Sequence, residues 1–231
     1  MTEVKICGIT NREDAMAAVS AGADAIGFIF HAPSPRWVPP DRVREIARKL
    51  PGRVCRVGVF VDQEPEEVRR VVRFCGLDFI QLHGKESPDY CGLFPAAVLI
   101  KAVALRGEPD LESLSLYPVR AILLDAYDPR QPGGTGRTGD WNLARKAAQK
   151  HAIILAGGLN AGNILAALEA VSPLAVDVGS GVEALPGKKD PGKVQELVAL
   201  VKGAGNPFPS RPEHSIFSHT PGEHVCLISD K

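Results

Sequence analysis

Residues 153–181 read IILAGGLNAGNILAALEAVSPLAVDVGSG, and this stretch contains two short apolar runs separated by a helical pattern. The runs, residues 153–156 and 175–178, are rich in Ile, Leu, Val and Ala, and each ends directly before glycine. Between them lies a segment that Asn160 could cap and that ends near Val171. Because parallel strands need a long crossover, usually a helix, this order predicts two parallel strands with a helix between them.

The same alternation continues through the rest of the chain. Further runs of strand length occupy residues 4–7, 24–30, 54–61, 78–82, 98–103 and 121–125. Helical segments with capping or proline signals are 12–20 after Asn11, 41–50 after Pro39-Pro40, 66–75 after Glu64-Pro65, 141–150 after Asp140, and a last helix that Asp190-Pro191 opens and that ends near Lys202. Strands that alternate with helices in this way predict a parallel sheet covered by helices.

Eight such strands in 231 residues favour closure of the sheet into a barrel. We therefore predict an α/β protein with a single (β/α)8 TIM barrel over residues 1–203 and a C-terminal extension over residues 204–231. The alternative is a doubly wound open sheet, which usually has fewer strands and carries its main phosphate loop after the first one. Prolines interrupt the extension, so we expect it to be irregular, or to pack on the barrel or on a second subunit through residues 225–228.

The composition excludes several classes of protein. Lys plus Arg and Asp plus Glu both total 27, so we expect no long-range attraction to nucleic acid or to an anionic membrane. The first residues lack the apolar core of a signal peptide, and no apolar run approaches the ~20 residues of a membrane span. The five cysteines show no CxxC spacing, and an odd number cannot all pair within the chain. We expect a cytoplasmic protein with reduced thiols.

Glycines at the ends of the last two strands predict a phosphate site. Gly157 and Gly158 follow the seventh strand, and Gly179, Ser180 and Gly181 follow the eighth. In (β/α)8 barrels the loops after these two strands, with a short extra helix, recurrently bind phosphate. Where Cβ atoms are absent, backbone N–H groups can approach phosphate oxygens closely. Tight turns without a ligand are the alternative interpretation of these glycines.

A further glycine-rich loop precedes Asp140. Residues 133–139 read GGTGRTG and contain a formal GxGxxG match that starts at Gly134. The loop lies well past the end of the preceding strand, and no acidic residue follows at the spacing of ~20 residues that a dinucleotide site requires. We instead expect a lid over the barrel mouth that contains Gly134, Thr135 and Gly136.

Several side chains that can transfer protons or bind polar groups stand at strand ends. Cys7 ends the first strand, His83 follows the fourth, Asp125 ends the sixth, and Asp177 lies near the end of the eighth. In a barrel such side chains point into the active site. Arg36, in the loop after the second strand, adds a fork of donors that suits a carboxylate. His83 could equally orient a loop, and Cys7 could be a small buried apolar residue.

A thiol base and a carboxylic acid would both need a perturbed pKa. At the reference pKa of ~8.5, Cys7 would be about 3% thiolate at pH 7, so a helix N-terminus or a cation would have to assist it. Asp125 would have to keep its proton about three pH units above its reference pKa, which a dry, apolar environment favours. A loop-capping role or an ion pair with Arg137 is the alternative for Asp125. Lys5 shares the parity of Cys7, and we expect it to pair with a carboxylate inside the barrel and not to be a catalyst.

Segments in chain order resemble the phosphoribosylanthranilate isomerases. The most specific is VKICGIT at residues 4–10. It is accompanied by GADAIGFIF at 22–30, SPR at 34–36, VGVF at 57–60, QLHG at 81–84, LD at 124–125, GGTG at 133–136, LAGGL at 155–159, VDV at 176–178, SGVE at 180–183 and PGKKD at 186–190. Where the family usually has Ser-Ser-Gly after the last strand, this chain has Gly179-Ser180-Gly181, and the lost hydroxyl should weaken phosphate binding modestly.

The resemblance implies an intramolecular oxidoreductase of tryptophan biosynthesis, an aldose–ketose isomerase that needs no cofactor and no metal. It would convert N-(5′-phosphoribosyl)anthranilate to 1-(2-carboxyphenylamino)-1-deoxyribulose 5-phosphate, an Amadori rearrangement. Cys7 would be the general base and Asp125 the general acid, while Arg36 would bind the anthranilate carboxylate and Asp177 a sugar hydroxyl. The partner would be a small phosphosugar, with no nucleic acid and no membrane, and the chain would be a monomer or a homodimer.

Two other functions stay open at this point. A related phosphosugar isomerase of histidine biosynthesis would use an Asp at the end of the first strand, where this chain has Cys7. A phosphate-binding barrel without catalysis would need neither Cys7 nor Asp125. Side chains of the extension that can bind metals are His214, His219, His224 and Cys226, but their spacing fits no standard zinc motif, and we expect no metal.

Overall fold

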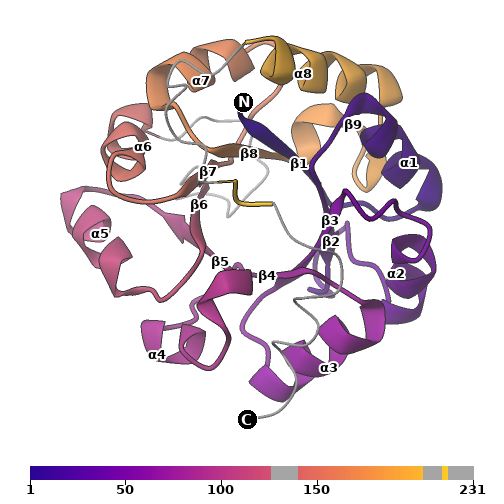
Figure 1. The fold of residues 1–231 in the computed structure, drawn as a ribbon, viewed down its shortest axis with the longest axis horizontal. Coiled ribbons are helices and arrows are strands. Elements are labelled where there is room, and N and C mark those ends of the chain that lie inside the picture. The colour runs from indigo at the N-terminus through magenta and orange to yellow at the C-terminus, as the bar shows by residue number, and fades with distance from the viewer. Residues whose placement is uncertain (126–139, 205–214, 218–231) are drawn as a thin grey trace.

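The computed structural model describes residues 1–125, 140–204 and 215–217. Its centre is a closed barrel of eight parallel strands in chain order, surrounded by helices (Figure 1). The strands are β1 (Glu3–Cys7), β2 (Ala25–Ile29), β3 (Cys55–Phe60), β4 (Phe79–Leu82), β5 (Leu99–Ala104), β6 (Ala121–Asp125), β7 (Ile153–Leu155) and β8 (Ala175–Val178). The barrel is a TIM barrel, and each strand end lies within about one residue of its predicted position, a shift smaller than assignment methods themselves differ.

Helices follow the strands around the outside of the barrel. They are α1 (Arg12–Ala21), α2 (Pro40–Ala47), α3 (Pro65–Cys75), α4 (Pro88–Cys91), α5 (Glu108–Ser113), α6 (Trp141–Ala148), α7 (Ile164–Val171) and α8 (Pro191–Gly203). Short additions are the 3-10 helices η1 (Ala96–Val98), η2 (Leu114–Leu116) and η3 (Ser180–Val182) and the hairpin of β9 (Glu183–Leu185) and β10 (Lys188–Lys189). The helix η3 and this hairpin follow β8 directly, so they lie at the mouth of the barrel.

Helix starts follow the capping signals, with one correction. The side chains of Asn11, Asp140 and Asp190 accept hydrogen bonds from backbone N–H groups in the first turns of α1, α6 and α8. Asn160 is not the cap of α7, which begins three residues later, after Asn163. The side chain of Asn160 instead accepts from the Gly162 N–H within the loop and so stabilises a local turn.

Two apolar layers alternate along each strand. On β6, Ala121 and Leu123 belong to the cluster inside the barrel, whereas Ile122 and Leu124 belong to the layer between the strands and the helices. Successive side chains of a strand point to opposite faces, so Asp125 shares the inward parity of Leu123. The same reasoning places Cys7 and Asp177 on the inner side of β1 and β8.

The segment 215–217 closes the N-terminal end of the barrel. Ile216 and Phe217 are 2% and 4% exposed and belong to the apolar cluster inside the barrel. The Glu3 carboxylate accepts hydrogen bonds from Ser215 Oγ (2.5 Å) and from the backbone N–H groups of Ile216 (2.7 Å) and Phe217 (3.1 Å). The Arg120 guanidinium donates to the carbonyls of Ser215 and Ile216. This segment therefore fills the barrel floor.

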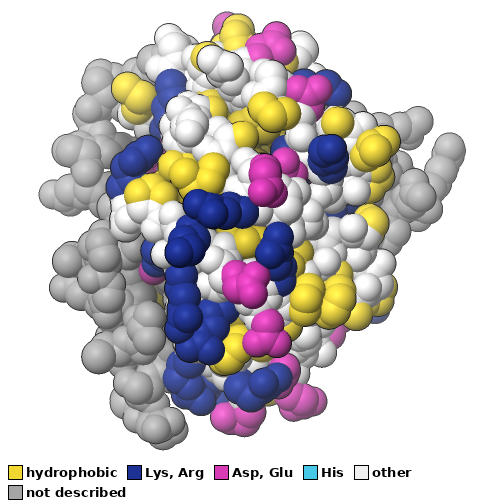
Figure 2. All heavy atoms as spheres, turned by 90° about the vertical axis from the view of Figure 1, so that its right-hand side faces the viewer, with side chains coloured by type: hydrophobic (Ala, Val, Ile, Leu, Met, Phe, Trp, Pro, Cys, Tyr) yellow, Lys and Arg dark blue, Asp and Glu magenta, His cyan; other side chains and the backbone are white. Residues whose placement is uncertain are grey.

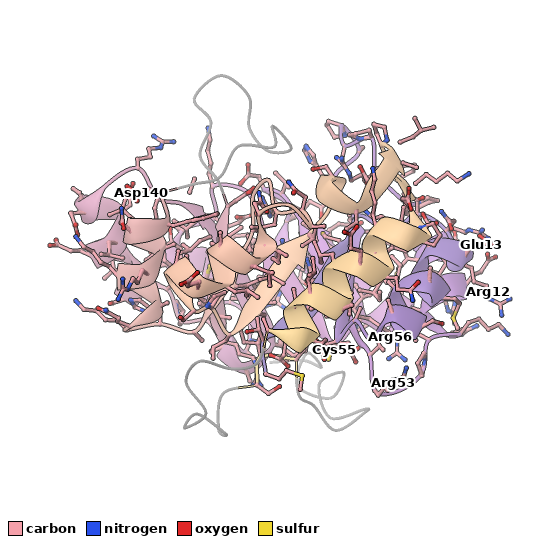
Figure 3. The ribbon with its side chains drawn as sticks, turned by 90° about the horizontal axis from the view of Figure 1, so that it is seen from above. Arg12, Glu13, Arg53, Cys55, Arg56 and Asp140 are labelled. Carbon is pink, nitrogen blue, oxygen red and sulfur yellow. The ribbon has the colours of Figure 1, made fainter. Side chains whose placement is uncertain are left out.

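Contacts of Phe217 reach several strands of the floor. Its ring meets the Phe79 ring edge-on, with centroids 5.8 Å apart. Its carbonyl accepts a hydrogen bond from the Cys55 thiol at 2.7 Å. Cys55 lies at the end of the barrel opposite Asp140, which precedes α6 at the mouth (Figure 3). Residues 225–228, which the sequence suggested as the packing part of the extension, lie outside the described residues.

The outer surface carries mixed charges. On the side that α1 and α2 cover, Lys and Arg side chains form a column with Asp and Glu side chains beside them (Figure 2). Several of these charges pair within a helix turn, as Arg70 does with Glu67 on α3. Among the helices of the described ranges, none is long and apolar enough to cross a membrane.

Candidate active site

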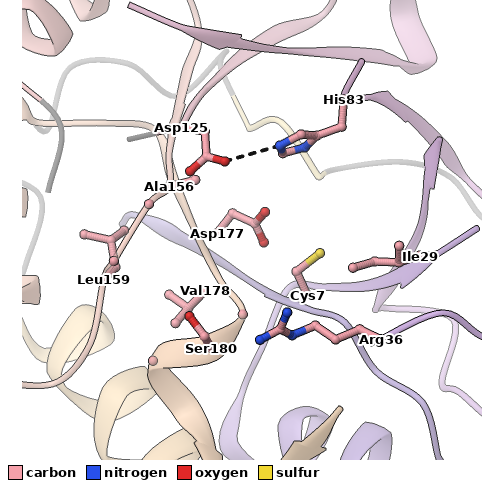
Figure 4. A pocket seen from close by; sticks show the side chains of 14 residues that line it. Cys7, Ile29, Arg36, His83, Asp125, Ala156, Leu159, Asp177, Val178 and Ser180 are labelled. Atoms are coloured by element: carbon pink, nitrogen blue, oxygen red, sulfur yellow. Dashed lines mark hydrogen bonds and ion pairs between the residues drawn. The ribbon is translucent and has the colours of Figure 1, made fainter. Parts of the chain in front are cut away.

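A pocket of about 160 Å³ opens at the C-terminal ends of the strands. It brings together every site residue that the sequence predicted within the described ranges (Figure 4). These residues are Cys7, Arg36, His83, Asp125, Gly157, Gly158, Asp177, Gly179, Ser180 and Gly181. Ile29, Ala156, Leu159 and Val178 supply the apolar part of the lining. The arrangement is a polar site with an apolar wall, suited to a small polar molecule that also carries an apolar group.

Cys7 lies beside an ion pair in the barrel interior. Lys5, two residues earlier on β1, is completely buried, and its Nζ lies 2.9 Å from Asp177 Oδ1. Strand register places Lys5 directly opposite Asp177 on β8. Burial and the neighbouring Asp177 carboxylate raise the pKa of the Cys7 thiol, and the Lys5 ammonium opposes this rise. The cation that a thiolate base would need is therefore present, although its effect does not outweigh burial.

His83 and Asp125 meet on the other side of Asp177 (Figure 4). His83 Nε2 lies 3.3 Å from Asp125 Oδ2, and Gln81 Nε2 lies 3.0 Å from His83 Nδ1. Because the Gln81 amide donates to Nδ1, the ring proton of a neutral His83 resides on Nε2, where it can donate to Asp125. His83 thus orients the Asp125 carboxyl group. Arg137, the alternative partner of Asp125, lies outside the described residues.

Arg36 is held by a second ion pair at the rim of the pocket. Its Nε and Nη2 donate to the two carboxylate oxygens of Glu183 at 2.8 and 2.7 Å. Lys189 Nζ, buried at this position, also donates to Glu183 Oε1 at 2.9 Å. Burial raises the pKa of the Glu183 carboxyl, but the two cations outweigh it, so this pKa lies below its usual range. Nη1 of Arg36 has no hydrogen-bond partner among the described residues and can bind a carboxylate.

The glycine-containing loops after β7 and β8 are in close contact. Gly157 and Gly158 adopt positive φ angles of 82° and 64°, which L side chains rarely adopt. A Cβ atom on Gly181 would stand 1.9 Å from the Leu159 carbonyl oxygen, so only glycine permits this approach of the loops after β7 and β8. The Asn163 side chain donates to the Gly158 carbonyl at 2.9 Å and holds the first loop in place. With η3, the loops form the surface that the sequence predicted for phosphate.

Other predictions fall on parts of the chain that the structure does not describe. They concern the lid residues Gly134, Thr135 and Gly136, and the side chains His214, His219, His224 and Cys226 of the extension. Across the described ranges, no group of three or more His, Cys, Asp or Glu side chains is placed to hold a metal ion. Cys7, Cys55, Cys75 and Cys91 form no disulfide bond within the described ranges.

Sequence reasoning missed three residues that shape the site. Glu183 and Lys189 lie on the hairpin after β8, and the contact of Glu183 with Arg36 spans 147 positions of sequence, which no local pattern reveals. Like Glu183 and Lys189, Gln81 was quoted only within a motif and was given no role. The sequence did contain a signal for Gln81. Gln81 and His83 are two positions apart at the end of one strand, so their side chains point to the same side of the sheet.

Comparisons with known proteins identify the family of the chain. A family model described as N-(5′-phosphoribosyl)anthranilate (PRA) isomerase matches residues 4–199. An N-(5′-phosphoribosyl)anthranilate isomerase of Citrifermentans bemidjiense is 52% identical over 202 residues, 87% of this chain and 98% of the relative. One of Syntrophus aciditrophicus is 50% identical over 202 residues, 87% and 88% of the two chains. The segment 215–217 lies beyond the family match.

Solved structures give the same result. The crystal structure of phosphoribosyl anthranilate isomerase from Thermotoga maritima has a TM-score of 0.82 at 43% identity and covers 88% of this chain and 100% of its own. A crystal structure of such an isomerase in complex with reduced 1-(o-carboxyphenylamino)-1-deoxyribulose 5-phosphate has a TM-score of 0.79 at 41% identity, with the same coverage.

Proposed function

Because the chain belongs to the N-(5′-phosphoribosyl)anthranilate isomerase family, enzymes of tryptophan biosynthesis, we propose that its mouth catalyses the Amadori rearrangement with Cys7 as base and Asp125 as acid. The observation that carries these roles is the placement of the two side chains. Cys7 on β1 and Asp125 on β6 line one pocket, with Asp177 between them (Figure 4). An acid and a base held on a fixed scaffold can act on two neighbouring atoms of one substrate.

The first step needs the acid. Protonated Asp125 gives its proton to the ribose ring oxygen, and the bond between this oxygen and C1′ breaks. The lone pair of the anthranilate nitrogen forms a double bond to C1′, which gives an open-chain iminium ion. His83, 3.3 Å from Asp125, holds the carboxyl group in the orientation for this transfer.

The second step needs the base. The Cys7 thiolate takes the proton from C2′, and the electrons of the C–H bond form the C1′–C2′ double bond and neutralise the iminium nitrogen. The resulting enolamine tautomerises to the ketone when the 2′-hydroxyl loses its proton and C1′ gains one. The proton that leaves the 2′-hydroxyl restores Asp125, and the proton that C1′ gains comes from Cys7. The electron pairs stay within the substrate throughout, so the chemistry calls for no redox cofactor.

The rest of the pocket suits the other groups of this substrate. Nη1 of Arg36 can bind the anthranilate carboxylate, and Asp177 can accept a hydrogen bond from a sugar hydroxyl. The loops with Gly157, Gly158, Gly179, Ser180 and Gly181 can bind the phosphate through backbone N–H groups. The family's small phosphosugar therefore fits the site, and a monomer or homodimer in the cytoplasm stays our prediction.

The experiment compares turnover with ligand affinity in Cys7→Ser and Asp125→Asn. Turnover of freshly generated phosphoribosylanthranilate is followed by the loss of anthranilate fluorescence, and affinity is measured with the reduced product analogue, which cannot react. We expect kcat to fall at least ~10²-fold in each variant, while Kd for the analogue changes little. A variant that turns over at the wild-type rate would remove that residue from the mechanism.

A further inference from the structure

Three lysines are buried within the described residues: Lys5, Lys101 and Lys189. An ammonium group inside a protein is costly unless hydrogen bonds and an opposite charge satisfy it. Lys101 meets this requirement fully, because its Nζ donates to Glu86 and to the carbonyls of Leu82, Gly84 and Ala102. Lys189 Nζ donates to Glu183 and to a loop carbonyl. Both have a structural role that their contacts explain.

Lys5 differs from the other two. Its Nζ has an ion pair with Asp177 but makes no hydrogen bond to a backbone carbonyl of the described residues. Lys5 and Lys101 also point to different sides of their strands. Lys101 points to the outer side of its strand, between Ile100 and Ala102 of the inner cluster, whereas Lys5 points into the barrel with Cys7. Lys5 is thus the buried lysine whose environment is left incomplete, and it lies at the base of the catalytic pocket.

Gly27 shows where the Lys5 ammonium and the Cys7 thiol meet. Gly27 is paired with Cys7 in the register of β1 and β2. A Cβ atom on Gly27 would stand 2.8 Å from Cys7 Sγ and 3.1 Å from Lys5 Nζ. The two groups therefore border the same space, the one that a side chain at position 27 would occupy. From there the Lys5 ammonium stabilises the negative charge of a Cys7 thiolate, and more strongly in a dry interior than in water.

We propose that Lys5 is a positioning residue that holds the Cys7 thiolate against Gly27 and compensates its negative charge. The proposal rests on the proposed function in one respect, the use of Cys7 as base. Lys5 itself does not touch the substrate. Its effect passes through the sulfur atom, whose charged form it stabilises and whose direction toward the pocket it fixes.

The charges around Cys7 support this assignment. They come from Lys5 on the same strand, Asp177 on β8, Lys189 on β10, and Arg36 in the loop after β2. Among them, Lys5 lowers the pKa of the Cys7 thiol most, and Lys189 does so less. Burial lowers the pKa of Lys5, but Asp177 and Cys7 outweigh it, so Lys5 stays protonated while the thiolate forms. Without Lys5, burial and Asp177 would act on the thiol unopposed on this side.

The test measures the alkylation of Cys7 by iodoacetamide as a function of pH, with the peptide that carries Cys7 quantified by mass spectrometry. Only the thiolate reacts, so the midpoint of the profile reports its formation. We expect Lys5→Met to move the midpoint up by about one pH unit or more, a rate about tenfold lower at any pH below it. Lys5→Arg, which keeps the charge, should restore most of the rate. The acidic limb of kcat/KM should shift in the same direction.

A matched control and a second variant keep the test decisive. Lys101→Met removes another buried lysine–carboxylate pair and should lower the melting temperature but leave the Cys7 profile unchanged. Lys5→Gln, which removes the charge but keeps a polar side chain, should raise the Cys7 midpoint as Lys5→Met does, and it tests the pair if Lys5→Met does not fold. A folded Lys5→Met variant with the wild-type profile would overturn the proposal.

The outcome is separable from the fate of the proposed function. Alkylation requires no substrate, so a shifted profile in a chain that does not isomerise phosphoribosylanthranilate would keep the Lys5–Cys7 pair and reject the reaction. Turnover that depends on Cys7, together with an unshifted profile in Lys5→Met, would keep the reaction and reject the role of Lys5.

Discussion

The mouth and the floor of the barrel are built from the same strands, yet their side chains differ in kind. At the mouth, Cys7, Asp125 and Asp177 lie at or next to the ends of three strands around an open pocket. At the floor, Ile216 and Phe217 fill the barrel and the Glu3 carboxylate receives three hydrogen bonds from their segment. The polar groups of the mouth face an open pocket, whereas at the floor the chain itself fills the barrel. Substitutions should therefore separate into effects on catalysis and effects on stability.

The largest expected effect is at the floor. Phe217→Ala removes a ring that is 4% exposed and should lower the free energy of unfolding by about 3–5 kcal/mol. Urea denaturation measures this change, and kcat/KM of the folded enzyme should stay within about twofold. Phe74→Ala is the control, because Phe74 is 37% exposed and should cost much less. A loss of activity at unchanged stability would contradict the separation of the two ends.

At the mouth, Gly181→Ala should affect catalysis more than stability. The new Cβ would stand 1.9 Å from the Leu159 carbonyl oxygen, so the loops after β7 and β8 must move apart. A displacement of about 1 Å costs on the order of 10²-fold in kcat/KM, and we expect most of it in KM, because we propose that these loops bind the phosphate. Steady-state kinetics measures the effect. Gly203→Ala is the control, because nothing lies within 4 Å of its Cβ position.

The pH dependence of kcat/KM tests the role of Cys7 as the base at the mouth. A base must be deprotonated to act, and burial and Asp177 raise the pKa of the Cys7 thiol. Activity is therefore gained as pH rises, and kcat/KM should increase about tenfold per pH unit below that pKa. A pH profile from 7 to 9 measures this limb. A plateau already reached at pH 7 would mean that the pKa of the Cys7 thiol is not raised and that the thiolate is already formed at pH 7.

The smallest expected effect concerns the partner of Arg36. Glu183→Gln weakens a bidentate ion pair and should raise KM about tenfold with a smaller change in kcat, because Arg36 loses its orientation. Glu67→Gln is the matched control, since Glu67 holds Arg70 in a similar bidentate pair on the exposed surface of α3. A change in kcat with KM unaltered would give Glu183 a different role.

The fold could be predicted because local signals coincide with it. Strand ends such as Cys7 and Asp125 follow apolar runs that alternate with capped helices, and their parity alone predicts which side chains point inward. Helices α4 and α5 were not located, because they are only 4 and 6 residues long and carry little periodicity. The Asn160 cap was wrong because that side chain stabilises a loop turn before α7.

The rest of the site depends on contacts between distant parts of the chain. Lys5 was predicted to pair with a carboxylate, and the partner is Asp177, 2.9 Å away on the neighbouring strand β8. Sequence could not supply the position of Lys5 relative to the Cys7 sulfur, since it follows from the absence of a side chain at Gly27. The same holds for the floor, where Glu3 and Phe217 are 214 positions apart in sequence.

The most direct test of the central claim is the turnover of freshly generated phosphoribosylanthranilate by the wild-type chain, followed by the loss of anthranilate fluorescence and by identification of the product. We expect rapid decay and 1-(2-carboxyphenylamino)-1-deoxyribulose 5-phosphate as product, with at least ~10²-fold slower decay in Cys7→Ser. Decay no faster than the uncatalysed reaction, in a folded protein that still binds the reduced product analogue, would contradict it.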